Sequence, residues 1–375
     1  MAECQIVTKV VTGIHSLTML RTYRKERILI ICDRFLRDKG TIARVTEELD
    51  PSNTVSLFAD TVPDPTLEVI ASGVTMAAGM QPTILIGFGG GAAIDTAKGI
   101  IYFSVFGKVV TQKPFFIAIP TTSGTGSEMT AFAVLTDTQT RRKLPVIDDT
   151  LYPDLAILDP HLVLSVPPSV TANTGFDVIT HAIEAYVSVS ASNFTDGVAC
   201  KSFELALRSL PVCYHDGENI AARKTMLSAS NMAGMAFNLS GLGMAHSMAH
   251  TLGGIFHVPH GLACAMFLPA SITYNSCLSE VKAKYADLAY KVGIAPRSLS
   301  HDGAIAALRA VLLALMDNME MPGHISALPE PIPQQKYEEE ISLMAQNALQ
   351  DRCLPENPVL LTYAAAVRIF HEIYE

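Results

Sequence analysis

The chain has 375 residues, 49% of them hydrophobic and 17% charged, a composition typical of a soluble globular protein too long for one hydrophobic core. Its formal net charge of −9 excludes nucleic acid and anionic membrane surfaces as expected partners, because no basic residues accumulate to neutralise phosphates. Seven scattered cysteines without a C-x-x-C pair indicate neither a disulfide framework nor a thiolate zinc site, and they fit a reducing, cytoplasmic location.

The first half of the chain alternates short apolar runs with segments of helical spacing. The apolar runs, four or five residues long, are typical of strands in a parallel sheet covered on both faces, and they span residues 28–32, 55–58, 83–86, 115–119 and 155–158. Residues 65–80 and 92–106 have the length and spacing of helices. This alternation predicts an α/β domain with ligands at the carboxyl ends of its strands.

The pattern changes after Pro167. Strand signals disappear, and long periodic segments rich in Ala, Met, Leu, Glu and Lys follow, with a loop expected at residues 329–333. We therefore predict an α/β domain at residues 1–166 and an all-helical domain at residues 167–375. We expect neither a signal peptide nor a membrane span, because the sequence offers no apolar run suited to either.

A glycine-rich turn follows the third expected strand. The stretch Gly87-Phe88-Gly89-Gly90-Gly91-Ala92 formally satisfies G-x-G-x-x-G/A, and a helix follows it. Glycines let the backbone approach a phosphate, and the first N–H groups of a helix attract its charge. The acid that usually comes about 20 residues later is absent here. The turn therefore predicts a pyrophosphate site, with an ordinary tight turn as the alternative.

Two polar features at other expected strand ends fit the same nucleotide. Asp33 follows the strand at residues 28–32, where its carboxylate could bind a ribose diol and repel a 2′-phosphate, favouring NAD over NADP. Residues 120–128, rich in Ser, Thr and Gly, follow the strand at residues 115–119 and could cradle a phosphate or ribose. The alternative for both features is helix capping. The loop lacks G-x-S-x-G, so no hydrolase nucleophile is indicated.

The helical half carries a cluster of histidines. Four of the eleven histidines fall within fifteen residues, at His246, His250, His257 and His260. His246 and His250 are four residues apart and therefore share a helix face. Gly253-Gly254 and Pro259 would end that helix and let His257 or His260 fold back toward the same point.

Asp177 and His181 repeat the same four-residue spacing upstream. Together with two of the later histidines they would supply three nitrogens and one carboxylate, a set that suits Fe²⁺ or Zn²⁺ better than Ca²⁺ or Mg²⁺. Glu184, on the same face, is a doubtful extra member. The alternative is a set of hydrogen-bonded core histidines, which is the commoner role of a single histidine on an apolar helix. H-E-x-x-H is absent, which disfavours a common metalloprotease.

These motifs, in this order and spacing, resemble the iron-containing (group III) alcohol dehydrogenases. The resemblance rests on Gly89-Gly90-Gly91 with Asp95 and Lys98, on residues 120–128, on Asp177-x-x-x-His181, and on His246-x-x-x-His250 followed by Pro259-His260-Gly261. It extends from about residue 28 to about residue 268. It implies the fold shared with dehydroquinate synthase, in which an α/β dinucleotide-binding domain and a helical domain have the active site in the cleft between them.

The resemblance also assigns roles to single residues. It implies metal ligands at Asp177, His181, His246 and His260, places His250 near the nicotinamide as a candidate proton relay, and makes His257 no ligand. The implied cofactor contacts, with Gly89 added from the glycine turn, are Asp33, Asp64, Gly89, Gly90, Gly91, Thr121, Thr122, Thr125 and Lys143. Ala92 departs from the family, which often has Ser there, so one phosphate hydroxyl is lost.

A finer similarity involves residues 62–66, 151–160 and 171–175, which look most like propanol and ethanol dehydrogenases of bacterial microcompartments. It implies NAD-dependent interconversion of a small primary alcohol and its aldehyde at a bound Fe²⁺ or Zn²⁺, with Phe132 and Phe237 beside a small apolar substrate. It further implies a homodimer, in the cytoplasm or inside such a compartment with its other proteins as partners.

Three alternatives remain open at this point. A glycerol-type polyol dehydrogenase would act on glycerol rather than propanal. A lyase or cyclase resembling dehydroquinate synthase would need basic residues for a phosphorylated substrate, and residues 240–268 contain no Lys or Arg. A scaffold of a microcompartment shell would leave the metal ligands without purpose.

Overall fold

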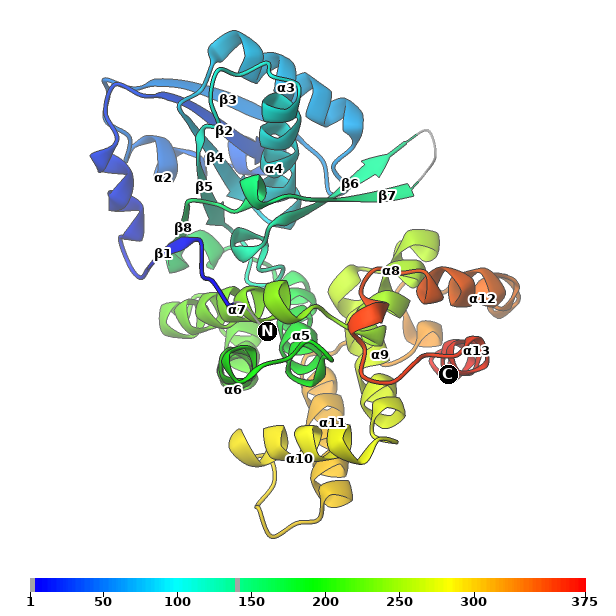
Figure 1. Cartoon of the computed structure of the whole chain (residues 1–375). Coiled ribbons are helices and arrows are strands. Elements are labelled where there is room, and N and C mark those ends of the chain that lie inside the picture. Colours follow the sequence, from blue (N-terminus) through cyan, green and yellow to red (C-terminus); the bar gives the residue numbers. More distant parts are fainter. Residues whose placement is uncertain (1–3, 139–141) are drawn as a thin grey trace. The chain divides into compact units, whose positions relative to one another are not determined.

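The computed structural model describes residues 4–138 and 142–375 (Figure 1). The chain divides into two compact units, Gln5–Val166 and Pro167–Glu375, the second of which also takes in Cys4. The first unit contains a parallel sheet with helices and the second is helical, so the predicted fold class is confirmed. None of the helices in the described ranges is long and apolar enough to cross a membrane.

Among the described residues, six strands form one parallel sheet in the order β1-β8-β5-β4-β2-β3. Their bounds are β1 Lys9–Thr12, β2 Arg27–Asp33, β3 Thr54–Thr61, β4 Ile84–Gly89, β5 Phe115–Pro120 and β8 Leu155–Leu158. The five predicted strands are confirmed. Strand β1 was not predicted, because its Lys9-Val10-Val11-Thr12 sequence at the sheet edge is short and half polar.

Successive residues of the central strands point to opposite faces of the sheet and belong alternately to two hydrophobic clusters. Ile28 and Ile30 belong to the cluster on one face of the sheet, whereas Leu29 and Ile31 belong to the cluster on the other. The inner residues of these strands are therefore apolar on both faces of the sheet, which explains the continuous runs in the sequence. The helices of this unit are α1 Arg34–Asp38, α2 Ala43–Thr46, α3 Leu67–Met80 and α4 Gly91–Phe106.

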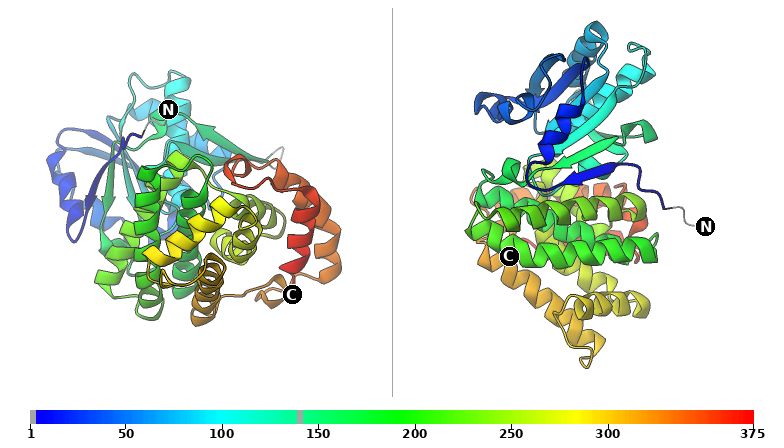
Figure 2. Two further views of the ribbon diagram at one scale, coloured as in Figure 1. Left: turned by 60° about the horizontal axis from the view of Figure 1, so that its bottom comes forward. Right: turned by 90° about the vertical axis from the view of Figure 1, so that its left-hand side faces the viewer.

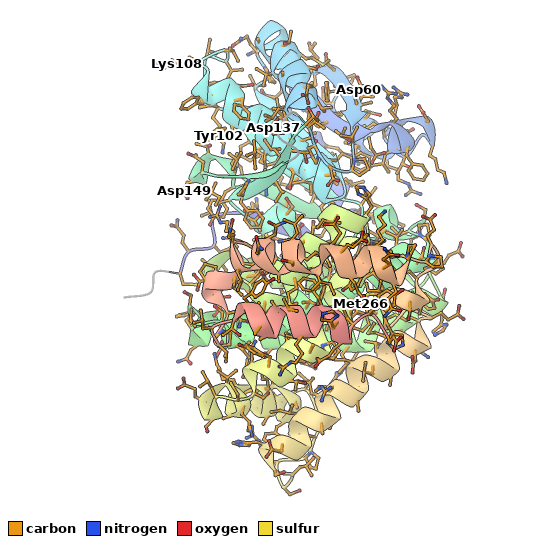
Figure 3. The ribbon with its side chains drawn as sticks, turned by 90° about the vertical axis from the view of Figure 1, so that its right-hand side faces the viewer. Asp60, Tyr102, Lys108, Asp137, Asp149 and Met266 are labelled. Atoms are coloured by element: carbon orange, nitrogen blue, oxygen red, sulfur yellow. The ribbon has the colours of Figure 1, made fainter. Side chains whose placement is uncertain are left out.

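A two-stranded antiparallel ribbon, β6 Phe132–Asp137 and β7 Arg142–Ile147, accompanies the sheet (Figure 1). The sequence did not predict it, because Pro145 and the charged residues of β7 argue against a buried strand. Pro145 is tolerated because a two-stranded ribbon leaves one side of each strand without a partner strand. Helix α4 lies near this ribbon, and Tyr102 and Lys108 mark its C-terminal end, remote from the glycine turn (Figure 3).

The second unit is built from helices, of which α5, α6 and α7 lie side by side (Figure 2). Their bounds are α5 Pro168–Val187, α6 Asn193–His215, α7 Ile220–Ser240, α8 Met244–Phe256, α9 His260–Asn275, α10 Ser279–Lys291, α11 His301–Asn318, α12 Gln334–Leu349 and α13 Tyr363–Glu372. Short 3-10 turns lie at Ser16–Thr22, Ser127–Met129, Asp149–Leu151, Pro160–Val163, Ile325–Ala327 and Leu354–Glu356. Residues 329–333 form the predicted loop.

One local prediction was wrong. Gly253 and Gly254 do not break helix α8, which continues through them to Phe256. The helix ends because His257 adopts the left-handed conformation at φ 57°, with its N–H donating to the carbonyl of Gly253. A Cβ at Gly253 would lie 3.3 Å from the carbonyl oxygen of Val258, so the glycine gives room for the chain to turn back toward α9.

Candidate functional site

The glycine turn joins β4 to the N-terminus of α4. Gly89 has φ +151°, and a Cβ on it would lie 2.6 Å from the Cβ of Ala93. A Cβ on Gly91 would lie 2.7 Å from the Cγ2 of Thr125. Gly90 is the N-cap of α4, and no side chain of that residue caps the first amides of this sixteen-residue helix. The turn is thus a backbone cradle that side chains would fill, and it fits a pyrophosphate.

The polar loop that follows β5 is attached to this turn. The N–H of Thr121 donates to the carbonyl of Gly89 at 3.0 Å. Thr122 also lies beside the turn, with its Oγ1 3.5 Å from where a Cβ on Gly90 would be. Thr125 Oγ1 accepts the N–H of Ser127 at 3.3 Å. The three predicted threonines therefore lie around the glycine backbone.

Lys98 of α4 anchors the same loop from inside the unit. Its buried Nζ donates to the carbonyl and Oγ of Ser127 at 2.7 and 2.9 Å, and to Thr130 Oγ1 at 2.8 Å. Burial lowers the pKa of Lys98 to about 8, against the opposing charges of Asp95 and Glu128. The ammonium group thus holds the loop in place beside the glycine turn.

Asp33 combines capping with a position suited to nucleotide binding. Its Oδ1 accepts the N–H of Leu36 at 2.8 Å and caps α1, the role foreseen as the alternative. Its Oδ2 lies 3.8 Å from where a Cβ on Gly89 would be. Because β2 and β4 are neighbours in the sheet, their carboxyl ends bring Asp33 next to the glycine turn. The two roles are compatible, since each uses a different oxygen.

The two remaining predicted cofactor residues lie in another part of the α/β unit. Asp64 is exposed in the segment between β3 and α3. The carbonyl of its neighbour Pro65 accepts the N–H of Thr136 at 2.7 Å, and Thr136 pairs with Lys143 across the β6–β7 ribbon. The main-chain segments that carry Asp64 and Lys143 are therefore close to each other in space. The side chain of Lys143 lies outside the described part of the structure.

The four predicted metal ligands meet in the helical unit. Asp177 and His181 lie one turn apart on α5, His246 lies in the first turn of α8, and His260 is the first residue of α9. The Oδ1 of Asp177 lies 3.7 Å from the Nε2 of His181, 3.5 Å from that of His246 and 3.4 Å from that of His260. Three helices thus bring nitrogens of three imidazoles within 3.7 Å of one carboxylate oxygen. The donor atoms that all lie within 4.8 Å of one another are those of Asp177, His246, His260 and Cys264.

The spacing and the missing hydrogen bonds both fit a metal ion. Donors about 2.0–2.1 Å from a tetrahedral ion are separated from one another by about 3.4 Å. Within the described part of the chain, neither Asp177 Oδ1 nor His246 Nε2 has a hydrogen-bond partner, although both residues are buried. Buried polar atoms are costly without a partner, and an ion would supply one. Burial would raise the pKa of Asp177, but the neighbouring imidazoles hold that pKa well below its usual range.

Close helix packing makes this convergence possible. Gly261 follows His260 on α9, and a Cβ on it would overlap the carbonyl oxygen of Asn173 on α5. A larger residue would push α9 away from α5 and separate His260 from Asp177. His257 is exposed at the end of α8 and is not part of the donor cluster, as the sequence resemblance implies.

Glu184, the additional candidate ligand, lies behind His246 rather than among the donor atoms. Its Oε2 is 2.6 Å from the Nδ1 of His246, and its two oxygens also accept the N–H groups of Gly243 and Ala245 at 3.0 and 2.7 Å. The carboxylate therefore caps helix α8 and directs the Nε2 of His246 toward Asp177. Its position seven residues after Asp177, which puts it on the same helix face, is the sequence pattern that indicated a role for Glu184 near the cluster.

His250 lies one turn after His246 and faces the rim of the cluster. Its ring stacks on that of His260 with centroids 5.2 Å apart, and its side chain is 41% exposed. Its Nδ1 lies 2.9 Å from the Oδ2 of Asp351, a residue that sequence reasoning missed because it lies 101 positions away. The carboxylate orients the imidazole and leaves its Nε2 for another partner.

Phe237 and Cys264 lie beside the donor cluster, whereas Phe132, the other aromatic residue that the resemblance singles out, lies in the α/β unit. Phe237 of α7 is buried and stacks on His181 with ring centroids 4.4 Å apart. Phe132 belongs to the α/β unit, where the Nζ of Lys98 lies 5.9 Å from its ring centre. The Sγ of Cys264 lies 3.7 Å from the Nε2 of His260. Sequence reasoning missed Cys264, although it follows His260 by four residues and so shares its helix face.

Comparison with known proteins gives concordant matches over nearly the whole chain. Residues 7–160 match the model of the iron-containing alcohol dehydrogenases, and residues 171–374 match the C-terminal model of the Fe-containing alcohol dehydrogenase family. The chain is 42% identical to the 1-propanol dehydrogenase PduQ of Salmonella typhimurium over 94% of each chain. It is 40% identical to PduQ of Citrobacter freundii over 100% of each chain.

A solved structure of 1,3-propanediol oxidoreductase resembles the chain with a TM-score of 0.92 and 30% identity, covering 100% of both chains. Sequence and fold therefore agree with each other and with the clustered carboxylate and histidines of α5, α8 and α9. This chain belongs to the iron-containing alcohol dehydrogenase family and is an oxidoreductase that interconverts alcohols and aldehydes.

Proposed function

We propose that the enzyme interconverts a short primary alcohol, propanol or ethanol, and its aldehyde, with NAD(H) as the redox cofactor and Fe²⁺ as the bound metal. The observation that carries this proposal is the meeting of Asp177, His181, His246 and His260 at spacings that match the donors of one ion. The similarity to two 1-propanol dehydrogenases supports the substrate class.

The metal would be held by the Asp177 carboxylate and by imidazoles of His181, His246 and His260. When bound, it would act as a Lewis acid toward the oxygen of the alcohol or aldehyde. Glu184 fixes the tautomer and direction of the His246 ring. The buried ring of Phe237, stacked on His181, supplies an apolar wall that suits a short alkyl chain better than a polyol.

The dinucleotide would lie on the backbone of Gly89, Gly90 and Gly91, with Thr121, Thr122 and Thr125 around its phosphates and ribose. When bound, it accepts or donates the hydride. Asp33 next to the glycine turn favours a free ribose diol and disfavours a 2′-phosphate, which is the reason for proposing NAD rather than NADP. Asp64 and Lys143 are proposed as further contacts of the same cofactor.

His250 is proposed to carry the proton between the alcohol hydroxyl and water. Oxidation of an alcohol releases one proton along with the hydride, and that proton must leave the apolar surroundings of the reacting oxygen. The half-exposed imidazole of His250 lies at the rim of the donor cluster and is oriented by Asp351. A neutral imidazole can accept a proton near pH 7.

The test is a substrate panel on protein reconstituted separately with Fe²⁺ and Zn²⁺. We expect NADH oxidation with propanal and acetaldehyde, and NAD⁺ reduction with the matching alcohols. Turnover of glycerol or 1,3-propanediol in preference to these would favour the polyol alternative, to which the 1,3-propanediol oxidoreductase fold lends some support. No turnover of any short aldehyde with either metal would contradict the proposal.

We further propose that the enzyme works as a homodimer in the cytoplasm, within a bacterial microcompartment. The similarity of residues 62–66, 151–160 and 171–175 to microcompartment dehydrogenases supports this location. Light scattering of the purified protein tests the dimer. Fluorescence microscopy of the labelled enzyme, in cells with and without shell proteins, tests the location, and a diffuse signal in both would contradict it.

A further inference from the structure

A sulfur atom lies inside the donor cluster of the helical unit. Donor atoms of Asp177, His246, His260 and Cys264 all lie within 4.8 Å of one another, so a thiol joins the carboxylate and two of the imidazoles. Its Sγ is 3.7 Å from the Nε2 of His260. A sulfur at about 2.3 Å and a nitrogen at about 2.0–2.1 Å from one ion are separated by roughly 3.1–3.8 Å when the angle at the ion is about 90–120°, as in a five-coordinate site.

The chain around Cys264 directs this thiol to the cluster. Cys264 is fully buried on α9, one helical turn after His260, and Gly261 holds that turn of α9 against α5. The atoms that face it include the buried Asp177 Oδ1 and His246 Nε2, which have no hydrogen-bond partner in the described part of the molecule. Met266, also buried on α9, belongs to the interior of the same unit (Figure 3).

We propose that Cys264 is a fifth donor to the ion held by Asp177, His181, His246 and His260, and that its sulfur gives this site a stronger preference for Zn²⁺ over Fe²⁺ than aspartate and histidine alone would give. The proposal rests on the metal site of the proposed function. Binding requires the thiolate, so the thiol proton passes to solvent when the ion enters, and no oxidant or reductant takes part.

The chemistry of the donor explains the expected preference. Thiolate is a soft ligand that favours zinc and binds cobalt readily, whereas carboxylate and imidazole discriminate less among divalent first-row metals. A cysteine that only filled space on α9 would leave the metal preference unchanged when replaced by the nearly isosteric serine. The two roles are therefore separable by measuring the metal and not the activity.

Cobalt substitution gives a direct readout of a sulfur ligand. The full-length protein loaded with Co²⁺ should show thiolate-to-cobalt charge-transfer absorption in the near ultraviolet, and Cys264→Ser should lose it. Cys213→Ser, which changes a buried cysteine on α6, is the matched control and should keep the band. A wild-type spectrum without this band would overturn the proposal.

A second cluster makes the assignment sharper. His250, Asp351 and Cys353 also have donor atoms within 4.8 Å of one another. A band that survived Cys264→Ser but disappeared in Cys353→Ser would overturn the proposal and place the sulfur ligand in that second cluster.

Competition between Zn²⁺ and Fe²⁺ provides the quantitative test. In anaerobic titrations, Cys264→Ser should reduce the ratio of zinc affinity to iron affinity by at least about 10-fold relative to the wild type. If wild type and variant bind a single ion with the same ratio, the proposal about Cys264 fails and the metal site itself stands. If the wild type binds no divalent ion, both this proposal and the proposed function fail.

Discussion

The Nδ1 atom of His246 lies 2.6 Å from the Oε2 atom of Glu184, so an imidazole of the donor cluster is backed by a buried carboxylate. The same carboxylate accepts the first amides of α8, which fixes the helix as well as the ring. One side chain on α5 thus links the start of α8 to the donor cluster. Because a carboxylate behind a metal-binding histidine sets the tautomer and basicity of that histidine, we propose that Glu184 tunes metal binding through His246.

Glu184→Gln should weaken metal binding about 10- to 100-fold, because the amide cannot stabilise the imidazole as a charged carboxylate does. Chelator competition with the purified protein measures this affinity. Glu204→Gln is the control, since Glu204 forms only surface ion pairs with Lys201 and Arg208. Equal affinities in wild type and Glu184→Gln would show that the carboxylate serves the helix alone.

His250→Ala should lower kcat by about 100-fold or more, as expected for the loss of a proton carrier, while the metal content stays unchanged. Burial lowers the pKa of His250, and the hydrogen bond and charge of Asp351 oppose that shift. Asp351→Asn should keep an acceptor for Nδ1 but remove the opposing charge, so the pKa should fall further. The rate profile of this variant should therefore shift toward lower pH. A variant with a lower rate but an unshifted pH profile would indicate a purely structural role for Asp351.

Asp33→Asn should relax the choice of cofactor. Asparagine retains a capping oxygen for the Leu36 amide, so α1 should persist, but the like charge facing a 2′-phosphate is gone. We expect the ratio of kcat/KM for NADPH to that for NADH to rise by at least about 10-fold, because like-charge contacts cost several kcal/mol. Asp38→Asn, at an exposed ion pair with Arg37, is the control. An unchanged ratio would remove Asp33 from the cofactor site.

Lys98 should make the stability of the protein depend on pH in the alkaline range. Its pKa is about 8 in the folded state and about 10.5 in the unfolded state, so the unfolded chain binds the extra proton between these values. The free energy of unfolding therefore gains a contribution on the order of 3 kcal/mol as pH rises from about 8 to 10.5.

In Lys98→Met the free energy of unfolding should lack this rise with pH. The difference in unfolding free energy between wild type and variant therefore separates the contribution of Lys98 from those of other titrating groups. Urea denaturation at a series of pH values is the measurement. Lys108→Met, at an exposed position beyond the C-terminal end of α4, should behave as the wild type (Figure 3). A wild-type and a Lys98→Met curve that run parallel across this range would contradict the pKa assignment.

Local pattern was enough to predict much of this molecule. The apolar runs gave the inner strands because Ile28 to Ile31 are buried on both faces of the sheet, and the four-residue spacing of Asp177 and His181 placed them on one helix face. Strand β1 and the β6–β7 ribbon escaped notice because edge strands and ribbons bury too little surface to demand apolar runs.

Relations between distant segments were harder to predict. The two four-residue spacings predicted that Asp177 and His181 share a metal with two of the later histidines. The choice of His246 and His260 came from the family resemblance, because the pattern of one chain does not tell which side chains meet. The partnership of His250 with Asp351 spans 101 positions and left no local signal. The prediction that Gly253 and Gly254 break the helix was wrong. Glycine is disfavoured in a helix interior, yet Gly253 lies inside α8 and makes room for the carbonyl of Val258.

The central claim is that one ion, bound by Asp177, His181, His246 and His260, is essential to alcohol and aldehyde interconversion. Elemental analysis of freshly purified protein, paired with the rate of NADH oxidation by propanal, tests it most directly. The account predicts a single ion per chain and full activity in the wild type and in His257→Ala, and loss of both ion and rate in His246→Ala. An active His246→Ala protein that retains its ion would contradict the account.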